Sequence, residues 1–360
     1  MTQTIKASCS INLGYPYHGA VPLNDLLIQM HDYVSQQSHQ PEELGTEQGA
    51  AVLEQKVAKL LGKKAALWLP TGTLAQGIAA RIHGQRIENG QLLLHPSSHL
   101  LLHEEEGYYH AHGSSAKIIG RWREPLQPED FDDAVGCAFI ELPQRHSGGK
   151  LPSWDALVAI KSRCKSQGIP LHMDGARLWS CRPFYNNKTY AQIASGFDSV
   201  YLSLYKDIGA IGGAILAGDK SFIDEARIWR TRLGGFSVGS WPLIYDALRL
   251  LDTRIAQMPE FVRKAGELAS SIGHIARLQA DPQLPHTNLF HILLPVSAQQ
   301  AQKARDQLAQ QHGIWLADRF WGYESDQQCA MEIVVGEKAL ALDKQVFAEA
   351  MAKFAHAIGK

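Results

Sequence analysis

The chain has 360 residues, of which 45% are hydrophobic and 20% are charged. At roughly 150 residues per domain, this length predicts two or so compact units with enough mass for a large core. This composition is close to that of ordinary soluble proteins, which excludes the disordered class. No run approaches the roughly 18 uninterrupted apolar residues of a membrane span, which excludes the membrane class. The 35 Lys and Arg residues nearly balance the 36 Asp and Glu residues. No positive field would attract nucleic acid or anionic lipid, so we expect a small-molecule partner.

The cysteines indicate a reducing compartment. They are five in number, widely spaced, and include no CxxC pair. Neither a disulfide framework nor a zinc knuckle is therefore predicted. The opening MTQTIKASCSINLGY lacks the basic head and apolar core of a signal peptide. We expect a cytoplasmic protein.

From about residue 45 to residue 240, helical patterns alternate with short apolar runs. This order favours a parallel or mostly parallel sheet. Gly62 can end a first helix, Ser153 and Gly168 can begin and end a second, and Asp219 can cap a third. The predicted strands are AALWL (65–69), GCAFIEL (136–142), IPLHMD (169–174), SVYLSL (199–204) and GGAILAG (212–218).

The pattern of predicted elements changes after about residue 242. Two long helical stretches follow there without a strand between them, LIYDALRLLDTRIAQM and FVRKAGELASSIGHI. Beyond them we predict strands at 287–294, 313–317 and 330–335, a helix from 297 to about 311 and a closing helix at about 342–357. The prediction is an α/β protein with a large domain over 1–242, which includes an N-terminal arm over about 1–40. A small C-terminal α/β domain covers 243–360.

Two charged residues follow predicted strands of the large domain. The segment LHMDGARLW (171–179) ends a strand on Asp174, and SVYLSLYKDIGAIGG places Lys206 just past the next strand. Ligands of open α/β sheets bind at such carboxyl ends. A lysine that can bond to an aldehyde and an aspartate that can pair with a protonated pyridine nitrogen suit pyridoxal phosphate. Taken singly, Lys206 could also be an ordinary surface lysine, and Asp174 could be an ordinary capping aspartate.

A third segment, LPTGTLAQGIAARIHG (69–84), combines a strand end, a Gly-Thr turn and a helix of small residues. Free N–H groups at the helix N-terminus, with the hydroxyls of Thr71 and Thr73, could hold a phosphate. Thr-Gly-Thr also makes an ordinary helix cap. The segment lacks the GxxxxGK of a nucleotide-binding loop, and GAIGGAILAG does not match a dinucleotide fingerprint that opens a helix.

Together, these segments resemble the L-threonine aldolase branch of the β-eliminating lyases, which are pyridoxal phosphate enzymes of fold type I. The resemblance runs through GKKAALWLPTGT, SSHLLLHEEEG, LHMDGARLW and SVYLSLYKDIGAIGGAILAGDKSFIDEARIWRTRLGG, and HTNLFHI echoes it more faintly. It implies the fold type I transferase-like architecture, with a mostly parallel central sheet and a smaller C-terminal domain. It also implies a homodimer or homotetramer.

The resemblance further assigns roles to single residues. It implies that Lys206 holds the cofactor covalently, that Asp174 pairs with its pyridine nitrogen, and that Gly72 and Thr73 bind its phosphate. Arg177 would lie against the ring hydroxyl and the substrate carboxylate. The implied role of His99 is to stack on the ring and to move a proton.

The run HEEEGYYHAHG (103–113) contains several metal-ligand types. We predict no metal site there, because the run aligns without a gap to a family segment that needs no protein-bound metal for chemistry. Three successive glutamates also indicate a solvated turn.

Several positions depart from the threonine aldolase pattern. Gln144 stands where the family has its second catalytic histidine, followed by Arg145 and His146, and Glu332 replaces an arginine that binds the substrate carboxylate. Val238 or a neighbour and Tyr205 are further departures. These departures predict a substrate pocket that differs from that of the family. Its candidate substrate-binding residues are Gln144, Arg145 and Arg177. Arg145 could instead pair with an acid such as Glu141 on the surface. Arg319 would then be the alternative residue for the substrate carboxylate.

These features predict a lyase that cleaves a β-hydroxy-α-amino acid to glycine and an aldehyde, with Lys206 and His99 as the catalytic residues. Two alternatives remain open at this point. One is β-elimination or transamination with the same lysine and aspartate. The other is a catalytically silent ligand-binding or scaffold protein on the same fold.

Overall fold

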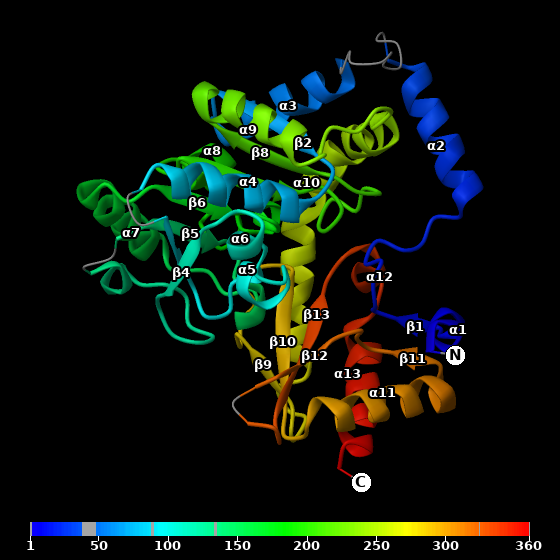
Figure 1. Cartoon of the computed structure of the whole chain (residues 1–360). Helices are drawn as coiled ribbons and strands as arrows, with labels where there is room; N and C mark the ends of the chain where they lie inside the picture. Colours follow the sequence, from blue (N-terminus) through cyan, green and yellow to red (C-terminus); the bar gives the residue numbers. More distant parts are fainter. Residues whose placement is uncertain (1, 38–47, 88–89, 133–134, 324, 360) are drawn as a thin grey trace. The chain divides into compact units, whose positions relative to one another are not determined.

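The computed structural model describes residues 2–37, 48–87, 90–132, 135–323 and 325–359 (Figure 1). The chain splits into two compact units. The large unit comprises Val21–His146 and Leu151–Ala256, and the small unit comprises Met1–Ala20, Ser147–Lys150 and Gln257–Lys360. The division after Ala256 lies inside helix α10 (Trp241–Ser271), which also contains the boundary expected after residue 242. The first twenty residues of the expected N-terminal arm belong to the small unit.

A seven-stranded sheet forms the centre of the large unit, with the order β2-β8-β7-β6-β5-β3-β4. Every neighbouring pair is parallel except the two that involve β8. The mostly parallel fold expected from the sequence is thus confirmed. The strands are β2 (Ala65–Leu69), β3 (Gln91–Leu94), β4 (Ser115–Ile118), β5 (Cys137–Glu141), β6 (Leu171–Asp174), β7 (Ser199–Ser203) and β8 (Ala214–Gly218). The sequence analysis did not identify β3 and β4.

Helices precede, connect and follow these strands. In chain order they are α2 (Leu23–Ser35), α3 (Gln48–Leu61), α4 (Gly72–Gln85), α5 (His99–Leu102), α6 (Gly107–His110), α7 (Trp154–Gln167), α8 (Tyr190–Ala194) and α9 (Lys220–Arg232). Ser153 begins α7 as predicted, since its hydroxyl accepts from Ala156 N at 3.1 Å, and Gly168 ends that helix with a φ of 68°. Asp219 occupies the N-cap of α9 but makes no side-chain cap bond. The predicted position of Asp219 at the start of α9 is thus confirmed, without a capping hydrogen bond to its carboxylate.

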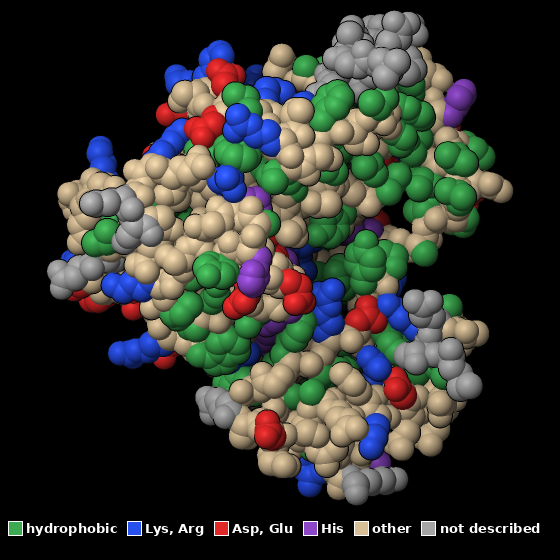
Figure 2. Space-filling view, viewed as in Figure 1, with side chains coloured by type: hydrophobic (Ala, Val, Ile, Leu, Met, Phe, Trp, Pro, Cys, Tyr) green, Lys and Arg blue, Asp and Glu red, His purple; other side chains and the backbone are tan. Residues whose placement is uncertain are grey.

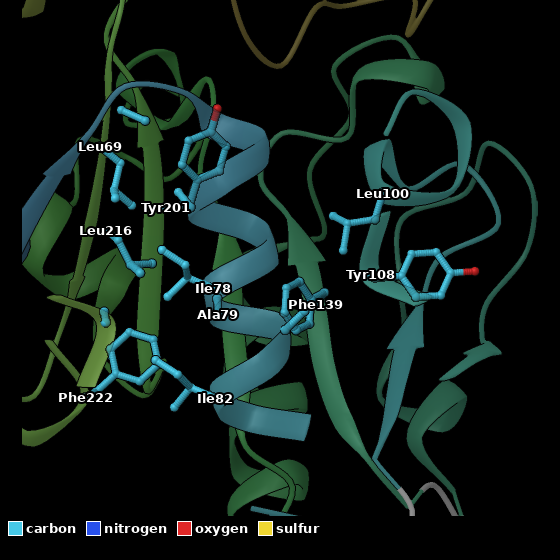
Figure 3. Packing of buried hydrophobic residues seen from close by; sticks show 14 of the residues in the cluster. Leu69, Ile78, Ala79, Ile82, Leu100, Tyr108, Phe139, Tyr201, Leu216 and Phe222 are labelled. Atoms are coloured by element: carbon cyan, nitrogen blue, oxygen red, sulfur yellow. The ribbon is translucent and has the colours of Figure 1, made fainter. Parts of the chain in front are cut away.

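Helix α4 is the element that covers the sheet nearest the predicted phosphate turn. Ile78, Ala79 and Ile82 are fully buried among side chains of β2, β3, β5, β7, β8 and α9 (Figure 3). The small residues Ala75, Ala79 and Ala80 let the helix backbone approach the sheet closely. Its N-terminus is thereby held at the carboxyl edge of the strands.

The small unit contains a four-stranded antiparallel sheet with the order β12-β13-β10-β9. Its strands are β9 (Gln279–Asp281), β10 (Leu289–Leu294), β12 (Phe320–Gly322) and β13 (Cys329–Val334). Its helices are α1 (Thr2–Ser8), α11 (Ala298–His312), α12 (Glu337–Leu340) and α13 (Lys344–Ala357). The predicted strand at 313–317 is reduced to β11 (Ile314–Trp315), which pairs in parallel with β1 (Ile11–Asn12) instead of joining this sheet.

The two helical stretches expected after residue 242 form one continuous helix. Helix α10 runs over 31 residues with Pro259 inside it. Proline removes one helical donor and usually marks a break. Here buried apolar residues continue on both sides of Pro259, including Ile244, Leu251, Phe261 and Leu268. Packing along the whole length therefore outweighs the local preference for a break.

Within the described residues, no helix combines the length and the apolar character needed to cross a membrane. All five cysteines are free thiols, and four of them are buried.

Candidate active site

The carboxyl ends of four neighbouring strands of the large unit carry the candidate site. Asp174 and Glu141 are the last residues of β6 and β5, and they face each other in the strand register. Lys206 follows β7, and His99 follows β3 and begins α5. Because parallel strands end at the same edge of a sheet, residues far apart in the sequence meet here.

Asp174 is buried and held by two hydrogen bonds. Its Oδ2 accepts from Gln76 Nε2 at 2.5 Å, and its Oδ1 accepts from the backbone N–H of Ala176 at 3.0 Å. Burial raises the pKa of Asp174, while the nearby charges of Lys206 and His99 act in the opposite direction. The carboxylate is therefore fixed in position and surrounded by donors and cations.

Lys206 lies in the loop after β7, and its charge interacts with that of Asp174. Burial lowers the pKa of Lys206, and the charge of Arg177 lowers it further, whereas Asp174, Glu141 and Asp207 raise it. The net effect is a lowered pKa. The amine therefore loses its proton more easily than an exposed lysine does, as a nucleophilic lysine must.

The N-terminus of α4 is shaped as the sequence predicted. Thr71 is the N-cap, and its hydroxyl accepts from Leu74 N at 3.2 Å. The amides of Gly72 and Thr73 precede Leu74 in the first turn, where helical N–H groups have no partner within the helix. A Cβ on Gly72 would overlap the hydroxyl of Tyr201 on β7. Only glycine lets the turn approach β7 this closely.

His99 pairs with a glutamate that the sequence analysis assigned to a solvated turn. His99 Nδ1 lies 2.8 Å from Glu104 Oε1, and the Glu104 side chain is only 5% exposed. Burial raises the pKa of Glu104 to about 7, although the charge of Lys206 acts to lower it. Glu105 and Glu106 are exposed, so the solvated-turn interpretation holds for them and was wrong for Glu104.

Glu141 is a second acid of the site, and the sequence analysis named it as a possible surface partner of Arg145. Its Oε1 accepts from the backbone N–H of Arg145 at 3.0 Å, and its Oε2 is shielded from solvent. Burial and the neighbouring Asp174 raise the pKa of Glu141 well above its usual range, with Lys206 and Arg177 acting against them. Glu141 is therefore partly buried among the titratable groups of the site, and because Arg145 is buried, the alternative of a pair on the surface was wrong.

The three candidate substrate-binding residues are all buried in the large unit. Arg177 follows β6, and its charge interacts with Lys206 and Glu141. Arg145 begins a short 3-10 turn after β5. Gln144 donates from Nε2 to Ser97 Oγ at 3.0 Å, which ties it to the turn that leads into His99.

Arg319 and Glu332 belong to the small unit, where they form an ion pair with Nη1 and Oε1 3.6 Å apart. The Glu332 side chain is 1% exposed, and that of Arg319 is 46% exposed. Arg319 thus supplies a compensating charge for a buried glutamate.

Comparison with known proteins gives the class and the family. The fold is that of the fold type I pyridoxal phosphate enzymes. Residues 28–294 match the beta-eliminating lyase family model, and the chain belongs to this family. A low-specificity L-threonine aldolase 1 from Arabidopsis thaliana is 27% identical over 287 residues, which cover 76% of this chain and 79% of the relative.

Two further comparisons agree. The low specificity L-threonine aldolase of Saccharomyces cerevisiae is 32% identical over 198 residues, which cover 51% of this chain and 49% of that protein. A crystal structure of a "putative L-allo-threonine aldolase" from Listeria monocytogenes is 32% identical, with a TM-score of 0.86. It covers 99% of this chain and 97% of its own.

The raised pKa of Glu104 predicts a pH-dependent stability difference from Glu104→Gln. The folded state holds the glutamate proton up to about pH 7, whereas the usual pKa is 4.5. Between these values the unfolded chain binds fewer protons, so the wild type loses unfolding free energy relative to the variant as pH rises. We expect a loss of up to about 3 kcal/mol that levels off above pH 7, measured by urea unfolding from pH 4.5 to 8.

Glu105→Gln, at the exposed neighbour in the same turn, is the matched control for this measurement. A pH-dependent gap of equal size in the control, or a gap that grows above pH 7, would contradict the assignment to Glu104.

Proposed function

We propose that this chain is a pyridoxal phosphate-dependent aldehyde-lyase that cleaves a threonine-like β-hydroxy-α-amino acid to glycine and an aldehyde. The observation that carries the proposal is the meeting of three groups at one sheet edge. These are the amine of Lys206, the carboxylate of Asp174 and the N-terminus of α4 at Gly72. Membership of the beta-eliminating lyase family and similarity to threonine aldolases support it.

The donor set fits pyridoxal phosphate. Lys206, with its lowered pKa, would hold the aldehyde carbon, and Asp174 would pair with the ring nitrogen. The first-turn amides of Gly72 and Thr73 would bind the phosphate, which a helix N-terminus favours through its dipole. When bound, this cofactor supplies an electron sink for the pair released as the Cα–Cβ bond breaks.

His99 and Glu104 would handle the proton of the substrate hydroxyl. Above about pH 7, where Glu104 is ionised, its carboxylate only accepts, so it fixes the proton of His99 on Nδ1, the atom 2.8 Å from Oε1. The lone pair then remains on Nε2, which can take the β-hydroxyl proton. Glu104 also stabilises the positive charge that forms on His99.

The substrate carboxylate would bind to Arg177 and Arg145. Both follow strands at the cofactor edge, after β6 and β5 respectively. Arginine can grip a carboxylate with two parallel hydrogen bonds. Arg319 is the weaker candidate, because its charge is paired with buried Glu332.

The reaction is tested by incubating purified wild type and Lys206→Ala with pyridoxal phosphate and a panel of β-hydroxy amino acids. We expect glycine and an aldehyde in equal amounts from the wild type, and no aldehyde above the background from Lys206→Ala. Borohydride treatment of the wild type should fix the cofactor to Lys206, as seen by peptide mass spectrometry. An oxo acid with ammonia would instead indicate elimination, and an oxo acid with the amino group retained on the cofactor would indicate transamination. No turnover of any amino acid would indicate a silent binding protein.

The carboxylate assignment is tested by Arg145→Lys. An ammonium cannot reproduce the planar fork of arginine. We expect kcat/KM for the best substrate to fall at least tenfold, about 1.4 kcal/mol, with the visible spectrum of the bound cofactor unchanged. Arg319→Lys is the matched control and should leave kcat/KM near the wild-type value. The reverse result would move the carboxylate site to Arg319.

The proposed enzyme is a homodimer or homotetramer in a reducing cytoplasm, where its free thiols would persist. Figure 2 shows hydrophobic side chains gathered over α2, and Leu23, Leu27 and Ile28 of that helix are more than half exposed. A second copy of the chain would cover such a surface. Light scattering at micromolar concentration should give a multiple of 39.8 kDa. A fully active species of this single mass would contradict the proposal.

A further inference from the structure

A chain of four buried hydrogen bonds runs from Asp174 away from the candidate site. Gln76 Nε2 lies 2.5 Å from Asp174 Oδ2, and Gln76 Oε1 lies 2.7 Å from His172 Nε2. Ser199 Oγ lies 2.7 Å from both His172 Nδ1 and His83 Nε2. None of these five side chains is more than 5% exposed.

Three elements build this chain through their regular spacing. Gln76 and His83 are seven residues apart on α4 and lie on the same face of the helix. His172 and Asp174 are two residues apart on β6 and point to the same side of the sheet. Ser199 begins β7 and pairs with His172 in the register. The packing of α4 on the two strands therefore aligns the chain.

The direction of each hydrogen bond follows from the carboxylate. Ionised Asp174 only accepts, so the amide nitrogen of Gln76 faces it and the amide oxygen faces His172. His172 must then donate from Nε2. Burial places the pKa of His172 well below its usual range, so the ring is neutral and its Nδ1 accepts from the Ser199 hydroxyl.

The last bond continues the same direction. Once the Ser199 hydroxyl donates to His172, its oxygen accepts from His83 Nε2. Burial lowers the pKa of His83 to about 3, so this ring is neutral and carries its single proton on Nε2. Every donor in the chain thus points toward Asp174. Aligned hydrogen bonds polarise one another and strengthen the final bond to a charge.

We propose that Gln76 is a positioning residue that, with His172, Ser199 and His83 behind it, keeps Asp174 ionised and oriented toward the cofactor ring nitrogen. The proposal rests on the proposed function in one respect, which is that Asp174 meets this nitrogen. The direction of the chain itself does not depend on any reaction. Desolvation works against the charge on Asp174, and the aligned donors offset it.

The competing explanation is that the chain only satisfies buried polar groups and stabilises the fold. Two measurements test the proposal without requiring turnover: the first tests the direction of the chain, and the second separates the two explanations. The first is the tautomer of His172 in the cofactor-free protein, read from the ¹⁵N shifts of its ring. We expect the proton on Nε2. A proton on Nδ1 would overturn the proposal, because the chain would then point the other way.

The second measurement uses the protein loaded with pyridoxal phosphate labelled with ¹⁵N in the ring. In the wild type we expect the shift of a protonated ring nitrogen. Gln76→Leu should move this shift toward the value given by Asp174→Asn and weaken cofactor binding at least tenfold. Ser199→Ala, which leaves the Gln76 contact in place, should move the shift in the same direction by a smaller amount.

The matched control is Ile78→Ala, which opens a buried cavity on the same helix outside the chain of hydrogen bonds. It should destabilise the protein and leave the ring nitrogen shift unchanged. Equal shifts in Gln76→Leu and the wild type, or equal shifts in Gln76→Leu and Ile78→Ala, would overturn the proposal. If Gln76→Leu does not fold, the ring nitrogen shift in Ser199→Ala decides, and a shift equal to that of the wild type would overturn the proposal. Failure to release aldehyde from any amino acid would reject the proposed function and leave both measurements valid.

Discussion

The site depends on keeping titratable side chains charged although burial disfavours their charged forms. Asp174, Glu141, Lys206 and Arg177 interact with one another where burial disfavours the charged form of each titrating group. Charges in such surroundings persist only when partners and hydrogen bonds offset desolvation. The strand order of the sheet supplies these partners, because β5, β6 and β7 are neighbours and end at the same edge. The fold therefore brings together groups that no single segment could hold.

The sequence predicted the residues that directly follow strong apolar strands. Asp174 ends LHMD and Lys206 comes soon after SVYLS, so their position at the sheet edge could be inferred from local pattern. The turn at Gly72 was likewise readable, since a strand end and a small-residue helix flank it. These features depend on neighbours in the chain, which a sequence displays.

Other parts of the site depend on packing and left no local signal. Glu104 is the same residue type as the two glutamates after it, and only the fold buries it against His99. Gln76 lies inside an ordinary helix, and its partners come from β6. The fold shows the same limit, because nothing in GIWLA indicates that β11 pairs with β1 and not with the four-stranded sheet. Long-range partners decide each of these cases.

The pairing of β1 with β11 has a consequence for the order in which the chain folds during synthesis. Ile11 pairs with Ile314, and the small unit combines residues near the start of the chain with those after Gln257. The large unit has all its strands once residue 218 has left the ribosome, so it can form first. The opening segment must meanwhile wait for a partner made about three hundred residues later. The small unit is therefore completed only when most of the chain has been made.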